Sequence, residues 1–94
     1  MLLSFLHNTS MDLSILLDMA SFDCLRTTLP AESTAAAALR QAGVFEKGRR
    51  FPGGAALIEC DEKEARELLA HAQTRCPESV QAITKAFRVA KLTP

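Results

Sequence analysis

The chain has 94 residues, of which 48% are hydrophobic, and its eleven basic residues balance its eleven acidic ones. This length fits one domain, and the apolar content excludes intrinsic disorder. A formal net charge of zero gives no electrostatic reason to expect nucleic acid or an acidic membrane as partner. The totals therefore predict a small globular domain.

Residues 1–20 are apolar and hold no Lys or Arg, since the first basic residue is Arg26. A secretory signal begins with a basic region, and a membrane-spanning helix needs about 20 consecutive apolar residues, so we predict neither. We interpret residues 1–20 as an N-terminal extension, either partly disordered or forming a short helix near Met11–Met19. The single globular domain is then expected at residues 21–92.

The first strand of the domain is predicted at residues 22–29, where side chains alternate and β-forming residues are common. Pro30 ends this strand and suits the first turn of a helix. That helix is indicated by apolar residues at helical spacing, namely Ala35, Ala38, Leu39 and Ala42. Gly43 predicts its end, because glycine adopts the left-handed conformation that often follows a helix.

Two further strands are predicted on either side of a glycine-rich turn. Residues 44–51 carry several charges and suit an edge strand, because charge at a sheet edge discourages aggregation. Pro52, Gly53 and Gly54 form the turn. Residues 55–60 (AALIEC) are the most apolar run in this part of the chain, so we expect them at the centre of the sheet.

The firmest prediction is an amphipathic helix from Asp61 to about Thr74. Asp61 suits the N-cap, and Glu64 stands three residues later, as a capping box requires. Two pairs at i,i+4 spacing, Glu62–Arg66 and Glu67–His71, should stabilise the exposed face. The buried stripe is predicted to be Ala65, Leu68, Leu69 and Ala72.

Residues 78–91 have two interpretations. As a helix they bury a stripe that includes Ile83 and Phe87, and the periodicity favours this reading. As a strand they place Ile83, Phe87 and Val89 on one face, and both the β-branched composition and the need to pair an open sheet edge favour that reading. We choose the strand.

The predicted order of elements is then β-α-β-β-α-β with short connections. It resembles the ferredoxin-like fold, an α+β sandwich with a four-stranded antiparallel sheet and two helices on one face. The resemblance covers residues 22–91 and is to a fold, not to a family. If residues 78–91 are helical, the prediction becomes a three-stranded sheet with three helices.

The sheet face left bare by the helices is the first candidate surface. It would carry Phe22, Cys24, Arg26 and Thr28 from the first strand, Ala55, Leu57 and Glu59 from the third, and Thr84, Ala86 and Arg88 from the last. This mixture is too apolar for water and too charged for a dry core, so we expect a homodimer through this face. The interface or ligand candidates are Phe22 and a charged cluster of Arg26, Glu59 and Arg88. The alternative is a solvated face, partly covered by the N-terminal segment.

A second candidate is an anion site in the hairpin. Lys47, Arg49 and Arg50 precede Gly53 and Gly54, and glycine lets backbone N–H groups approach a phosphate. The spacing matches neither a P-loop nor a dinucleotide fingerprint. A charged edge strand closed by a turn explains the same residues, and we favour it.

The cysteines and histidines give no catalytic or metal-binding pattern. Cys24, Cys60 and Cys76 are an odd number without a close pair, which predicts reduced thiols in the cytoplasm. His71 has no second histidine nearby, and a metal site needs three or four converging ligands, so we expect a surface histidine and no metal or cofactor. Cys76 lacks the neighbouring base that a nucleophile needs.

These patterns predict a non-enzymatic binding or regulatory domain that dimerises through its open sheet face. Its ligand would be a small molecule or a protein, and no membrane partner is expected. The alternative is nucleic-acid binding or RNA processing, which the zero net charge and the shortage of aromatic residues disfavour. Its phosphate contacts would be Arg26, Lys47, Arg49, Arg50, Lys85, Arg88 and Lys91. A third alternative is a metal-dependent enzyme.

Overall fold

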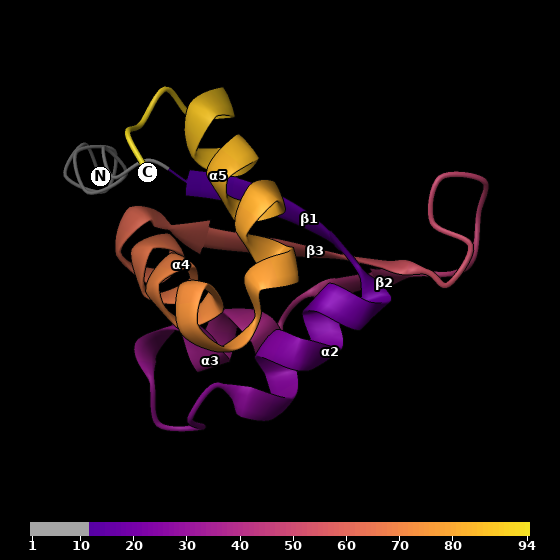
Figure 1. The fold of residues 1–94 in the computed structure, drawn as a ribbon, viewed down its shortest axis with the longest axis horizontal. Coiled ribbons are helices and arrows are strands. Elements are labelled where there is room, and N and C mark those ends of the chain that lie inside the picture. Colours follow the sequence, from indigo (N-terminus) through magenta and orange to yellow (C-terminus); the bar gives the residue numbers. More distant parts are fainter. Residues whose placement is uncertain (1–11) are drawn as a thin grey trace, which may run out of the picture.

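The structure is a computed structural model that describes residues 12–94. In chain order the elements are β1 (Asp12–Asp18), α2 (Met19–Thr28), α3 (Thr34–Arg40), β2 (Gly43–Phe45), β3 (Ala55–Asp61), α4 (Glu62–Arg75), a 3₁₀ turn (Pro77–Ser79) and α5 (Val80–Val89). The long β1–β3 pair crosses the molecule, and the loop between β2 and β3 extends beyond the helical part (Figure 1).

The sheet has three strands in the order β1-β3-β2, and both neighbouring pairs are antiparallel. β1 pairs with β3 along its whole length, from Asp12 opposite Asp61 to Asp18 opposite Ala55. β2 pairs only briefly, with Phe45 opposite Ala55 at one end. The prediction that residues 55–60 form the central strand is confirmed.

The ferredoxin-like prediction is wrong. In the described part of the chain the sheet has three strands and is accompanied by four α-helices, instead of four strands and two helices. Residues 22–29 lie in and just beyond α2, and residues 78–91 contain α5. The alternative with a three-stranded sheet fits in part, because the last segment is helical, but the first strand is Asp12–Asp18.

The first strand lies upstream of residues 22–29, in residues 12–18, where the alternation of exposed and buried side chains is complete. In β1 every second side chain is buried, namely Leu13, Ile15 and Leu17. Asp18 then starts α2, and its carboxylate accepts a hydrogen bond of 2.8 Å from the Ser21 N–H. This cap favours helix for the residues that follow, with Phe22 and Leu25 buried. The remainder of the predicted extension, residues 1–11, lies outside the described residues.

Helical periodicity, not composition, decides the last segment. Ile83 and Phe87 are fully buried, whereas Val89 is 75% exposed, which a strand with all three on one face does not allow. β3 pairs with β2 on one side and with β1 on the other, so residues 78–91 cannot pair with the central strand.

The α4 helix begins as predicted. Asp61 accepts from the Glu64 N–H at 2.8 Å, and Glu64 accepts from the Asp61 N–H at 2.9 Å, so the capping box is confirmed. The Glu62–Arg66 ion pair also forms, at 2.8 Å. The predicted Glu67–His71 pair is wrong, because the Glu67 Oε1 instead accepts the backbone N–H of Ala35, in the first turn of α3, at 2.6 Å.

The core lies against one face of the sheet. Side chains of β1 and β3 that point into it include Ile15 and Ile58, and the helices supply residues such as Leu25, Leu68 and Phe87.

Side chains at the intervening strand positions point to the opposite side, which we call the open face. It carries Ser14, Leu16, Phe45, Leu57 and Glu59.

The helical assignment of the last segment can be tested by stability. Truncation of fully buried Ile83 to Ala should lower the free energy of unfolding by about 2–5 kcal/mol, because it leaves a cavity in the core. Val89→Ala, on the exposed side of α5, should change it by no more than about 0.5 kcal/mol. Urea denaturation measures the free energy of unfolding of both variants. Equal decreases for Ile83→Ala and Val89→Ala would indicate that residues 80–89 do not form α5.

Candidate functional site

The apolar middle of the open face is formed by two strand residues that face each other. Leu16 of β1 lies opposite Leu57 of β3, and Leu16 is 40% exposed. Phe45 of β2, which is 51% exposed, continues the apolar surface toward the hairpin loop. Large exposed apolar side chains that are contiguous indicate a contact surface more often than single ones do.

The hairpin loop brings basic and aromatic residues to one end of this face. A shallow hollow there is lined by Leu16, Phe45 and Phe51, together with Arg49 and Arg50. Glu46 lines the same hollow, so the two guanidinium groups beside the apolar middle leave this end of the face with an excess of one positive charge.

A second hollow continues from the first along the outer side of β1. Ser14 and Leu16 of β1 line it together with Arg50 and Phe51 of the loop, and Lys85 and Val89 of α5 form its other side. Because Leu16 and Phe51 line both hollows, the apolar surface extends from β2 to α5.

The opposite end of the face is acidic. Asp12, Glu59, Asp61 and Glu64 line a hollow where β1 begins and β3 ends. Burial of the Cys60 thiol, and then the nearby carboxylates of Glu64, Asp61 and Asp12, raise the pKa of Cys60 from 9.0 to about 12. The open face thus has an acidic end, an apolar middle and a basic end.

The raised pKa of Cys60 makes the free energy of unfolding depend on pH in the alkaline range. Folded chains keep the Cys60 proton between pH 9.0 and about 12, where the unfolded chain loses it. The folded state then binds more protons, so the free energy of unfolding should fall as the pH rises through this interval. Cys60→Val should show a shallower fall in urea denaturation at a series of pH values. Identical slopes for the two proteins would mean that the thiol is not shielded.

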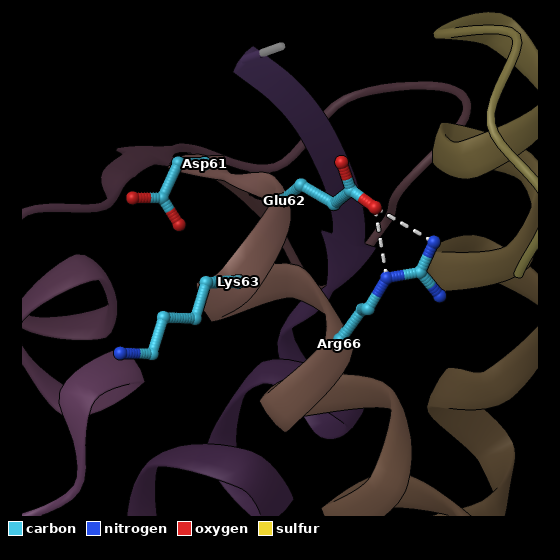
Figure 2. A pocket seen from close by; sticks show the side chains of 4 residues that line it. All are labelled: Asp61, Glu62, Lys63 and Arg66. Atoms are coloured by element: carbon cyan, nitrogen blue, oxygen red, sulfur yellow. Dashed lines mark hydrogen bonds and ion pairs between the residues drawn. The ribbon is translucent and has the colours of Figure 1, made fainter. Parts of the chain in front are cut away.

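Another hollow lies at the start of α4 and is lined by Asp61, Glu62, Lys63 and Arg66. Figure 2 shows Glu62 and Arg66 turned toward each other, while Lys63 points away from them. The Arg66 Nη2 also donates to the Thr93 carbonyl at 3.0 Å. Glu62 and Arg66 neutralise each other and the Asp61 carboxylate caps α4, so this hollow is a weaker candidate than the open face.

The predicted interface cluster is not assembled. Glu59 lies on the open face and is exposed, but Arg26 lies on α2, where it pairs with Asp23 at 2.8 Å. Arg88 lies on α5, and Phe22 is only 4% exposed and belongs to the core. Cys24, Thr28, Thr84 and Ala86, which were expected on the same face, also lie on helices.

The predicted anion-site residues lie on two sides of the hairpin. Arg49 and Arg50 line the hollow of the open face, whereas Lys47, Gly53 and Gly54 line a separate one. Lys47 therefore lies with the two glycines, whereas the two arginines do not.

Gly54 has a structural reason for being glycine. Its φ of 94° is unfavourable for other residues, and a Cβ there would lie 3.0 Å from the Phe45 carbonyl oxygen and 3.1 Å from the Met19 Cγ. The Gly54 carbonyl also accepts from the Met19 N–H at 3.2 Å, which joins the hairpin to the start of α2.

The cysteine prediction is wrong for two of the three residues. Cys24 of α2 and Cys76, just after α4, form a disulfide with a Cα–Cα distance of 6.0 Å. Cys60 is a free, buried thiol. His71 is half-buried, and its Nε2 lies 2.7 Å from the Thr28 Oγ1, so it is not the freely exposed histidine that was expected.

Sequence reasoning missed Leu16, Phe45 and Phe51 as members of the surface. Leu16 had a usable signal, because it is the apolar exception at an outward position in the alternating run DLSILLD. Phe45 and Phe51 had none, since they were assigned to a charged edge strand, and only the path of the loop brings them together.

Comparison with protein-family models, with curated proteins and with solved structures gives no match for this chain. Within residues 12–94, no helix is both long enough and apolar enough to cross a membrane. Over the same range, no group of three or more His, Cys, Asp or Glu side chains is arranged to hold a metal ion. The open face is therefore interpreted from its own chemistry.

Proposed function

We propose that this protein is a binding or regulatory module that forms a homodimer through its open face. The observation that carries this proposal is the position of the exposed apolar residues Leu16 and Phe45, between an acidic end and a basic end of one sheet surface. Water is a poor environment for such a surface, and burying it against a partner is favourable.

The distribution of charge favours a second copy of the same chain as the partner. A twofold axis that lies in the interface, parallel to the sheet and across the strands at the level of the Leu16–Leu57 pair, would lay the apolar middle of one copy on that of the other. The same rotation would place the acidic end, with Glu59, over the basic end, with Arg49 and Arg50. Such an interface pairs apolar surface with apolar surface and opposite charges with each other, as a closed symmetric dimer requires.

The dimer can be tested by sedimentation of the full chain at concentrations well above micromolar. Leu16→Glu should shift it to monomer, because a carboxylate would be buried in the apolar middle. Val44→Glu is the matched control, since Val44 is an exposed apolar residue, at 61%, that alternates to the other side of β2. A monomeric wild-type protein at these concentrations contradicts the proposal.

A charge exchange tests the orientation of the two copies. Glu59→Arg and Arg50→Glu should each weaken the dimer, because each places like charges opposite one another across the axis. Combining both changes in one chain should restore much of the affinity. Additive weakening in the double variant would exclude this twofold arrangement.

A second candidate, nucleic-acid binding, is favoured by one observation. Phe45 and Phe51 line the same hollow as Arg49 and Arg50, and single-stranded nucleic acid binds where bases stack on aromatic rings beside phosphate-binding cations. The acidic end of the face would repel a strand that extended further. This function is therefore limited to a short segment at the loop end.

Fluorescence anisotropy with a labelled single-stranded RNA pool at low salt tests this candidate. Binding should weaken as salt rises and should be lost on Phe51→Ala together with Arg50→Ala. Lys63→Ala, beside the hollow of α4, is a control for general charge. No binding of the wild-type protein at low salt eliminates the candidate.

We also propose that the protein is located in the cytoplasm. Disulfides in cytoplasmic proteins are usually transient or redox-sensing, and this chain has one between Cys24 and Cys76. A cytoplasmic location therefore requires that the Cys24–Cys76 bond exchange readily with thiols.

A further inference from the structure

We propose that the Cys24–Cys76 disulfide is a thiol-exchange site at which Cys24 accepts a low-molecular-weight thiol and Cys76 is the leaving group. This site lies between α2 and the end of α4, and it is independent of the open face and of the dimer. Three features support this assignment: the unequal burial of the two cysteines, the position of Thr28, and the hydrogen bond between Thr28 and His71.

The two cysteines differ in access. Cys76 is completely buried, whereas Cys24 is partly exposed. A thiolate must approach the sulfur that it attacks from outside the protein. Cys24 is therefore the sulfur that is attacked, and the electron pair of the broken bond is left on Cys76.

A buried thiolate at Cys76 needs a hydrogen-bond donor, and Thr28 is in position to be one. The Thr28 Oγ1 lies 3.5 Å from the Cys76 Sγ. The same hydroxyl now donates to the Cys24 carbonyl, one turn earlier in α2, at 2.7 Å. Rotation of the hydroxyl hydrogen from that carbonyl to the sulfur would stabilise the leaving group.

His71 positions the Thr28 hydroxyl. A hydroxyl has one hydrogen, and that of Thr28 is given to a carbonyl, so the contact of 2.7 Å with the His71 Nε2 requires the imidazole to be the donor. With an N–H of His71 bonded to its oxygen, Thr28 can direct its own hydrogen only to the carbonyl or to the sulfur. His71 thus acts through Thr28 as a positioning residue.

The exchange balances with a thiol as the reductant. A deprotonated thiol RS⁻ attacks the Cys24 Sγ, an RS–Cys24 bond forms, the Cys24–Cys76 bond breaks, and the Cys76 thiolate takes up the proton that the incoming thiol released. A second thiol then attacks RS–Cys24, which yields the Cys24 thiol and the disulfide RSSR. Two thiols are oxidised while one protein disulfide is reduced.

Reduced glutathione is the probe for this site. The folded, oxidised full chain is treated with it, the reaction is stopped by acid, and free thiols are alkylated before peptide mapping by mass spectrometry. The expected intermediate carries glutathione on Cys24 and a free thiol on Cys76. Glutathione on Cys76, or a disulfide that is reduced only when the chain is unfolded by denaturant, overturns the proposal.

Substitutions in α2 separate this role from a purely structural one. Thr28→Val should slow reduction about tenfold or more, because a hydrogen bond to a charged group is lost, while Thr28→Ser should retain the wild-type rate. Thr27→Val is the matched control, since the Thr27 hydroxyl donates within its own helix, to the Asp23 and Cys24 carbonyls. Circular dichroism checks that each variant is folded. A wild-type rate in folded Thr28→Val overturns the role of Thr28, and the peptide map of the wild-type chain decides the proposal even if that variant does not fold.

Discussion

The antiparallel pairing of β1 with β3 is the interaction on which the rest of the structure depends. Its register places Leu16 opposite Leu57 and fixes which side chains enter the core. Because neighbouring residues in a strand point to opposite faces, a shift of one residue would exchange the buried and exposed sets completely. The register thus directs fully buried strand residues such as Ile15 and Ile58 toward the helices.

The two surfaces for which a function is proposed follow from this arrangement. The helices attach to one side of the sheet, so the other side keeps an apolar middle between charged ends. On the helical side, packing of α2 against α4 brings together Cys24, Thr28, His71 and Cys76, which are far apart in the sequence. The first surface is the one proposed for assembly and the second the one proposed for thiol exchange, and neither proposal requires the other.

Local signals in the sequence predicted some elements well. The capping residue Asp61, the stripe of α4 and the apolar strand before it all act over a few residues, so they can be recognised without tertiary information. The fold was missed because residues 22–29 and 78–91 carry β-like composition, although a cap at Asp18 and the burial of Ile83 and Phe87 make them helical. The disulfide and the Phe45–Phe51 hollow depend on long-range packing, which spacing alone does not reveal.

In the proposed dimer the open face meets its own copy around a twofold axis near Leu16. Any residue close to such an axis lies near its counterpart in the second chain, whereas a residue on the other side of β2 does not. A cysteine introduced at position 16 and treated with a short bismaleimide, which the buried Cys60 thiol does not reach, is the most direct test of this geometry. We predict a covalent dimer for Leu16→Cys and none for Val44→Cys, and equal cross-linking of the two variants, or none of either, would contradict the account.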